Sequence, residues 1–258
     1  MTAGLDPTGG LRYHLRARRY RTTLWAPFAR AVSRWLATWN PPERELLLVG
    51  PSGGYCLDLV WLSRFERVTV LEIDPLARWI FARRVKRAFE AAKLAPPSLA
   101  FDRRDHLSPR AGRFVIEPLR ALLEEHTQSS VLFCNILGQL PLLGPDPPEQ
   151  LPDPPPEGSY ERWLAQLVEA LEGHSWASFH DRLSGTIRPR AELSLDLSPW
   201  RSSEALVADL YAETTDETAV LEDHRTSALA PKVPRAQMLW QLDRGVFHLI
   251  EALSITRD

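Results

Sequence analysis

The sequence predicts an α/β protein built on a mostly parallel sheet with helices on both faces. Apolar runs of strand length alternate with stretches of helical periodicity along most of the 258 residues, and this alternation is typical of βαβ crossovers. The first of the apolar runs leads directly into a glycine-rich turn. Hydrophobic residues make up 44% of the chain and charged residues 25%, which is typical of a folded globular protein and excludes wholesale disorder.

The N-terminal part of the chain reads as a basic helix. Apolar side chains recur at three- and four-residue spacing within 11–39, and Asn40-Pro41-Pro42 ends the helix because a residue before proline is pushed out of the α region. We expect residues 1–42 to form a helical extension, or lid, on the sheet. Eight Arg and three acidic residues give segment 1–45 a net charge of +5, although the whole chain carries -2. An Arg-rich helix face of this kind either contacts nucleic-acid phosphates or faces solvent above a ligand, and both alternatives stay open.

The elements of the first half follow in order. The apolar run 46–49 predicts a buried strand, and Gly50-Pro51-Ser52-Gly53-Gly54 predicts a turn after it. Asp74-Pro75 opens a long helix, since proline suits the first helical position. The predicted elements here are the strand 46–49, a helical stretch at 54–64, the strand 68–73 and the helix 76–92.

The second half continues the alternation and then changes character. The segment 141–158 contains eight prolines and is predicted to be an extended loop, and 238–250 predicts an antiparallel hairpin around Asp243-Arg244-Gly245. The predicted elements are the strand 98–103, a helix at 115–126, the strand 131–136, a helix at 159–172, a strand at 176–179, a helix at 199–212 capped by Ser198, and hairpin strands at 238–242 and 246–250.

The glycine turn and the end of the next strand together indicate a nucleotide-type ligand. Glu72 stands 22 residues after Gly50, which is close to the spacing at which a carboxylate reaches a ribose hydroxyl in such folds. The turn lacks the Lys of a phosphate-binding P-loop and departs from the Gly-x-Gly-x-x-Gly dinucleotide pattern. Ser52 also fits the Gly-x-Ser-x-Gly nucleophile elbow, but only a helical head precedes it, where a hydrolase needs earlier strands.

LLLVGPSGG at 46–54 and VTVLEIDP at 68–75 resemble the glycine and acidic motifs of class I S-adenosylmethionine (SAM)-dependent methyltransferases. The pair is also similar to the spermidine synthase branch of that superfamily, and FCNILG at 133–138 looks like its fourth-strand motif. The resemblance implies a Rossmann-like doubly wound sheet with strand order 3-2-1-4-5-7-6 and an antiparallel last strand, formed by residues 43–258.

The resemblance also implies a set of ligand-binding residues. Glu72 would hold the ribose hydroxyls of SAM, the glycine turn would line its methionine end, and Asp105-His106 would lie near the adenine. Two positions depart from the family pattern, because Leu48 replaces a frequent carboxylate and Ser52 replaces the middle glycine. The predicted cofactor-binding residues are Gly50, Ser52, Gly53, Gly54, Glu72, Ile73, Asp74, Asp105, His106 and Asn135.

Three polar residues are candidates for catalysis, in positions that follow predicted strands. Asn135 is expected to orient an amine or hydroxyl at the carboxyl edge of the sheet, where ligands of such folds bind. His180 and Asp181 are expected just past the fifth strand, as a base and the residue that orients it. Each of these side chains could instead form only local hydrogen bonds. Methyl transfer proceeds by direct displacement, so positioning can supply most of the catalysis.

The resemblance predicts a SAM-dependent methyltransferase with a small-molecule substrate. An aminopropyltransferase and a non-catalytic binding or scaffold protein of the same fold remain as alternatives. The two cysteines and seven histidines show no zinc-site spacing, so no metal is expected. Arginines interrupt every apolar stretch before residue 40, so we expect neither a signal peptide nor a membrane span and place the protein in the cytoplasm.

Overall fold

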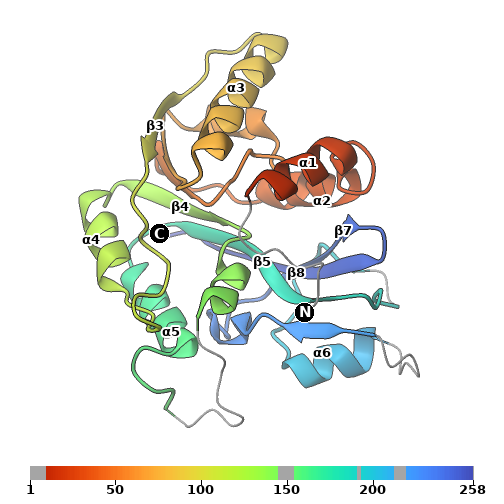
Figure 1. Cartoon of the computed structure of the whole chain (residues 1–258). Coiled ribbons are helices and arrows are strands. Elements are labelled where there is room, and N and C mark those ends of the chain that lie inside the picture. Colours follow the sequence, from red (N-terminus) through yellow and green to blue (C-terminus); the bar gives the residue numbers. More distant parts are fainter. Residues whose placement is uncertain (1–9, 145–153, 191–192, 212–218, 258) are drawn as a thin grey trace.

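The computed structural model describes residues 10–144, 154–190, 193–211 and 219–257. In this part of the chain eight strands form one sheet with the order β3-β2-β1-β4-β5-β8-β7, and β6 pairs with β5 off this path (Figure 1). The strands are β1 (Glu45–Val49), β2 (Arg67–Leu71), β3 (Ser98–Asp102), β4 (Ser129–Cys134), β5 (Trp176–Gly185), β6 (Leu221–Asp223), β7 (Ala236–Asp243) and β8 (Val246–Ile255).

This order confirms the predicted doubly wound fold. The short strand β6 is an addition, and it shifts the numbers of the two hairpin strands from 6 and 7 to 7 and 8. Strands β1 to β5 are parallel to one another, whereas β6 and β8 run antiparallel to β5. The parallel order places the carboxyl ends of these five strands along one edge of the sheet, where ligands bind in such folds.

The helices cover both faces of the sheet. The α-helices are α1 (Gly10–Tyr20), α2 (Ala26–Leu36), α3 (Pro75–Ala92), α4 (Glu117–Glu125), α5 (Tyr160–Ala170) and α6 (Ser203–Leu210), and the 3-10 helices are η1 (Leu59–Arg64), η2 (Leu137–Leu143) and η3 (Thr226–Ala228).

Alternation along the strands divides the apolar core into two main layers. In β1, Leu46 and Leu48 pack with α1, α2, η1 and α3, whereas Leu47 and Val49 pack on the other face with α4 and α5 (Figure 1). Because both faces are covered, β1 and β4 read as continuous apolar runs rather than as alternating ones. A smaller cluster lies between α6 and the ends of β5 and β8.

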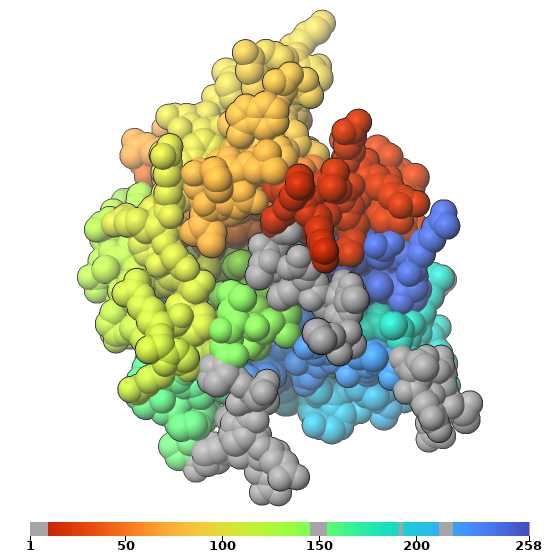
Figure 2. Space-filling view, in the orientation of Figure 1, coloured from red at the N-terminus to blue at the C-terminus, as the bar shows by residue number. Residues whose placement is uncertain are grey.

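The N-terminal helices pack directly on the sheet. The rings of Trp25 and Trp240 on β7 lie with centroids 5.1 Å apart, and the Trp25 indole N–H donates to the carbonyl of Leu242 at 3.0 Å. In the space-filling view these helices lie against the start of α3 and against the C-terminal hairpin (Figure 2). Residues 10–42, the described part of the predicted extension 1–42, thus share one hydrophobic core with the sheet.

A buried carboxylate joins distant segments at the amino ends of the strands. Glu43 accepts hydrogen bonds from Ser130 Oγ at 2.8 Å and from Ser175 Oγ at 3.1 Å, and it pairs with Arg257 Nε at 2.8 Å. The segment before β1 is therefore bound to β4, to the start of β5 and to the C-terminal end of the chain.

Apart from β5, three of the predicted elements were wrong in extent or kind. The helix expected at 11–39 is two helices, because Pro27 starts a new helix after a turn. The stretch at 54–64 contains only η1, whose first turn is capped by Asp58. The helix expected at 199–212 begins at Ser203, and its cap is Ser202, whose Oγ accepts from the Ala205 amide at 3.2 Å, rather than Ser198.

The largest correction concerns β5, which the sequence predicts to end at residue 179. The strand continues to Gly185, so His180 and Asp181 lie inside it rather than after it. The reason is that β8 pairs along its whole length, which gives backbone partners to a polar segment that otherwise resembles a loop. The register shifts between Asp181 and Leu183, which marks an irregularity of the β-bulge type.

Two further expectations concern the Pro-rich segment and membranes. Within 141–158, Pro141 lies in η2 and 154–158 carries no helix or strand, while 145–153 lies outside the described residues. Among the described helices, none combines the length and apolar character that crossing a membrane requires.

Candidate active site

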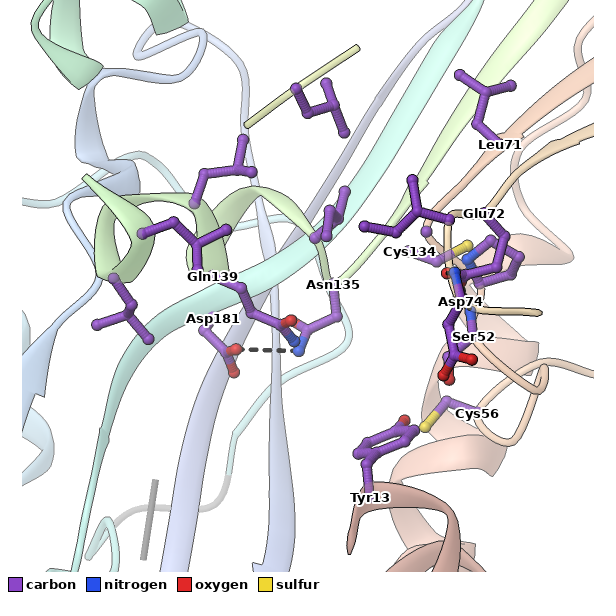
Figure 3. Close-up of a pocket in the computed structure, with 18 of the residues that line it drawn as sticks. Tyr13, Ser52, Cys56, Leu71, Glu72, Asp74, Cys134, Asn135, Gln139 and Asp181 are labelled. Atoms are coloured by element: carbon purple, nitrogen blue, oxygen red, sulfur yellow. Dashed lines mark hydrogen bonds between the residues drawn. The ribbon is translucent and has the colours of Figure 1, made fainter. Parts of the chain in front are cut away.

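A cavity of about 390 Å³ lies at the carboxyl edge of the sheet, between the glycine turn on one side and β5, β7 and β8 on the other. Its two halves face each other in Figure 3, with Glu72, Asp74 and Ser52 opposite Asn135 and Asp181. Among the residues predicted from the sequence, the cavity wall includes Gly50, Ser52, Glu72, Ile73, Asp74, Asp105, His106, Asn135 and Asp181. Gly53, Gly54 and His180 are not on the wall.

Glu72 is held rigidly at the end of β2. Its Oε2 accepts the Ser52 amide at 3.0 Å and its Oε1 accepts the Asp74 amide at 3.0 Å. Burial raises the pKa of Glu72 above its ordinary value, although the two amide hydrogen bonds oppose this shift. Each oxygen keeps a further lone pair, so the carboxylate can accept hydrogen bonds from two hydroxyl groups of a ligand.

The glycine turn has a strained conformation that brings Ser52 to Glu72. Ser52 has φ of 49° and Gly50 has φ of +63°, in the left-handed region that non-glycine residues rarely adopt. A Cβ at Gly53 would lie 2.7 Å from the Tyr55 ring. A Cβ at Gly54 would likewise lie 2.9 Å from Leu59, so both glycines permit the close packing of the turn, and their role at the methionine end of a ligand stays a prediction.

Helix α1 contributes to the same half of the site. His14 Nε2 lies 3.2 Å from Asp74 Oδ2, and its Nδ1 lies 3.0 Å from the Tyr55 hydroxyl. Burial opposes ionisation of Asp74, but its hydrogen bonds, including that from His14, outweigh burial and lower its pKa. The next residues on this face of α1, Tyr13 and Arg16, line the cavity, and Arg16 also pairs with Asp243 at 3.0 Å.

The remaining residues expected near an adenine lie at the rim of the cavity, and most of their polar atoms already form hydrogen bonds within the protein. His106 Nε2 contacts Asp102 at 3.0 Å and its Nδ1 contacts the Pro118 carbonyl at 3.0 Å. Asp105 Oδ1 accepts the amides of Leu107 and Ser108, and these hydrogen bonds lower the pKa of Asp105 despite burial. Ile73 is 57% exposed and presents an apolar surface at the cavity mouth.

A hydrogen-bonded chain of three side chains forms the opposite wall. Asn135 Nδ2 donates to Asp181 Oδ2 at 2.9 Å, and His248 Nδ1 lies 2.7 Å from Asp181 Oδ1 (Figure 3 shows the first of these bonds). Burial alone would raise the pKa of Asp181, but His248, His224 and Asn135 outweigh it and lower the pKa. Because a carboxylate only accepts, Nδ1 of His248 carries a proton, and in the neutral imidazole Nε2 then has a free lone pair.

This wall has two polar atoms without partners. Asn135 Oδ1 and His248 Nε2 are buried and have no hydrogen-bond partner within the described part of the chain. Asn135 also has φ of 54°, which a non-glycine residue adopts only at a cost of about 1–3 kcal/mol. Buried polar atoms without partners, on a strained residue in a cavity wall, indicate a position for a ligand.

His180 does not take part in this arrangement. Its side chain is fully buried, its Nδ1 contacts Ser178 Oγ at 2.9 Å, and burial together with Arg235 and Arg182 holds its pKa well below the ordinary value. The structure therefore brings Asn135 and Asp181 together, but the histidine beside Asp181 is His248.

His248 and His224 are the site residues that the sequence interpretation missed. His248 occupies the strand parity of Ile250 and Ala252, which face the apolar core, and it pairs across the hairpin with Trp240. The sequence did contain a signal: His248 stands on the side of the strand whose other residues are apolar and buried. A buried polar side chain at such a position indicates a structural or functional role. His224 lies just after the short strand β6, which no sequence pattern predicted.

Asp181, His224 and His248 also form a group that could hold a metal ion, because one ligand atom of each lies within 4.8 Å of the others. Hydrogen bonds already use both nitrogens of His224, with Gly138 O at 2.6 Å and Ser184 Oγ at 2.8 Å. Both oxygens of Asp181 are used as well. The group therefore resembles a hydrogen-bonded network more closely than a set of free ligands.

Comparison with known proteins gives structural matches alone, since no family model and no curated protein matches the chain. The chain is similar to magnesium protoporphyrin IX methyltransferase from Synechocystis PCC 6803, solved with bound SAM, at 11% identity and a TM-score of 0.46, over 99% of this chain and 100% of that one. It is similar to the N-methyltransferase NodS from Bradyrhizobium japonicum WM9, in complex with S-adenosylhomocysteine, at 12% identity and a TM-score of 0.40, over 93% and 87% of the two chains.

A third match is an rRNA methylase from Streptococcus thermophilus, at 10% identity and a TM-score of 0.38, over 87% of this chain and 93% of that one. These identities and TM-scores are low, so the fold assignment rests on the strand order. That order, with its reversed last strand, is the one that the sequence resemblance to class I methyltransferases implies.

Proposed function

We propose that this protein is a SAM-dependent methyltransferase. The single observation that carries the proposal is the position of Glu72, which is fixed by two backbone amides at the end of β2 and faces a cavity at the carboxyl edge of the sheet. A carboxylate fixed there suits the two ribose hydroxyls of an adenosine. Gly50 and Ser52 would line the same ligand beside it.

The charge of the cavity supports a cationic cofactor. Its wall carries the acidic residues Glu72, Asp74, Asp105 and Asp181. The two arginines on the wall are already paired, Arg16 with Asp243 at 3.0 Å and Arg104 with Asp102 at 2.8 Å. A sulfonium centre is favoured by such surroundings, whereas a phosphate is not.

When bound, SAM would supply an electrophilic methyl group, and the chain would supply position and a dry environment. Glu72 would orient the adenosine end. Trp240, Leu242 and Phe179, which line the opposite half, would exclude water from the acceptor. We infer a small-molecule acceptor, because this half is part of a cavity of about 390 Å³.

Isothermal titration of the full chain tests the proposal with three ligands: SAM, S-adenosylhomocysteine and decarboxylated SAM. Tight binding of the first two supports a methyltransferase. A preference for decarboxylated SAM supports the aminopropyltransferase alternative and overturns the proposal. Absence of binding for all three supports a non-catalytic protein of this fold.

A further inference from the structure

The wall formed by Asn135, Asp181 and His248 offers two buried hydrogen-bond acceptors side by side. Asp181 fixes both, because its Oδ2 accepts one amide proton of Asn135 and its Oδ1 accepts the His248 Nδ1 proton. Within this group, Asn135 Oδ1 and His248 Nε2 are left without partners, and the indole N–H of Trp240 on the same half of the cavity is a donor without a partner in the described part of the chain. The orientation of the Asn135 amide follows from the same contact, since only its nitrogen can donate to a carboxylate.

The number of N–H or O–H groups needed to satisfy these two atoms distinguishes between classes of methyl acceptor. A hydroxyl group carries one proton and can satisfy only one of the two atoms, whereas a primary amine carries at least two N–H groups. Leaving a buried acceptor unpaired is unfavourable, so the amine fits better. The nearby Asp181 carboxylate and the ring of Trp240, whose centroid lies 5.5 Å from that of His248, also favour an ammonium group over an anion.

We propose that the methyl acceptor is a primary amine on an apolar or aromatic carbon frame, held by Asn135 Oδ1 and His248 Nε2, with His248 as the base that removes its proton. The proposal rests on the proposed methyltransferase function. Asp181 is a positioning residue, because it holds the imidazole in the tautomer whose Nε2 faces the ligand. The carbon frame would lie against Trp240, Leu242 and Phe179.

The proposed step balances without any further reactant. His248 Nε2 takes one proton from the bound ammonium group, which frees the nitrogen lone pair. That pair forms the new nitrogen–carbon bond to the methyl group as the carbon–sulfur bond breaks and its electrons remain on sulfur. The products are a protonated N-methylamine, a neutral thioether and the His248 imidazolium, which the Asp181 carboxylate stabilises until the proton passes to solvent.

The test uses matched pairs of probes on the full chain. We would titrate 2-phenylethylamine, benzylamine and tryptamine, and the corresponding alcohols 2-phenylethanol, benzyl alcohol and tryptophol, with and without saturating S-adenosylhomocysteine. At least one amine is expected to bind about tenfold or more tightly than its alcohol, as loss of one charge-assisted hydrogen bond implies. If every alcohol binds as tightly as its amine, or no amine binds, the proposal is overturned.

Variants locate the effect on the two acceptor atoms. His248→Gln and Asn135→Gly are each expected to weaken amine binding about tenfold and to leave alcohol binding nearly unchanged. Glycine is chosen at position 135 because it tolerates the positive φ there. The control is His126→Gln at the C-terminus of α4, near the amino ends of the strands, which should match the wild type. Equal loss for amine and alcohol in both cavity variants would contradict the assignment.

Two measurements on the protein itself complete the test. Nitrogen NMR of the imidazoles should show His248 protonated at Nδ1 and free at Nε2. Asp181→Asn should abolish this preference, whereas Asp181→Glu should keep part of it. The opposite tautomer in the wild type overturns the proposal. A stoichiometric metal in the purified protein that is lost in His224→Gln would overturn it as well, in favour of a metal site.

The two proposals fail in different ways. If S-adenosylhomocysteine does not bind but an amine still binds ahead of its alcohol, the methyltransferase function fails and the amine site stands. If S-adenosylhomocysteine binds and no amine exceeds its alcohol, the methyltransferase function stands and the amine site fails.

Discussion

Replacing Glu72 by Gln tests the cofactor half of the site most directly. The two carboxylate oxygens hold the amides of Ser52 and Asp74 at 3.0 Å each and keep two lone pairs for the ribose. Gln keeps one acceptor oxygen and turns an NH₂ group toward one of those amides. A hydrogen bond to a charged group contributes about 1.5–3 kcal/mol, so we expect a loss of about 3 kcal/mol, or roughly 100-fold in the Kd for S-adenosylhomocysteine.

The same strand offers a matched control. Glu66 directly precedes β2, as Glu72 directly follows it, and its exposed side chain pairs with Arg44 at 2.8 Å. Titration calorimetry of wild type, Glu72→Gln and Glu66→Gln should show weaker binding for Glu72→Gln alone. If Glu72→Gln binds S-adenosylhomocysteine as the wild type does, with an unchanged Tm, the carboxylate does not hold the ribose and the proposed site is wrong.

Three more outcomes are expected. Burial raises the pKa of Glu72 above 4.5, and the ligand needs the ionised carboxylate. The affinity for S-adenosylhomocysteine should therefore fall as the pH drops through that raised pKa, at a higher pH than for an ordinary Glu. In Glu72→Gln the affinity should not change over this pH range. Gly50→Ala places a Cβ at a φ of +63° and 2.9 Å from Ile136 Cβ, so urea denaturation should show a loss of about 1–3 kcal/mol, larger than for Gly173→Ala, where φ is +87° but no atom lies within 4 Å. Glu43→Ala removes the acceptor for two serines and an arginine and should lower the free energy of unfolding by about 3 kcal/mol; an unchanged denaturation midpoint would show that water replaces it.

The cofactor half was predictable because its residues are close in sequence. The strand, the glycine turn and Glu72 lie within the one segment that runs from β1 through η1 to the end of β2, where local pattern and spacing are sufficient. The acceptor half depends on pairing between β5 and β8, which are far apart in the chain. No local signal shows that a polar segment after Phe179 continues as a strand, or that Asp181 lies beside His248 rather than using His180.

The prediction of a single N-terminal helix failed for a similar reason. The three- and four-residue spacing of apolar side chains continues through the turn at 21–25, so periodicity alone does not reveal the break. The break is set by Pro27 and by the contact of Trp25 with the carbonyl of Leu242, which lies near the other end of the chain.

The place of β8 in the sheet bears on how the protein is made. Although β8 is the last strand in the chain, it lies between β5 and β7 and pairs with both. On a ribosome, the segment up to Asn135 could assemble the glycine turn and Glu72 early, while β5 would wait for its partner. Long-range pairing of this kind is slow, so a nascent chain would complete the ligand half that carries Glu72 well before the half that carries His248.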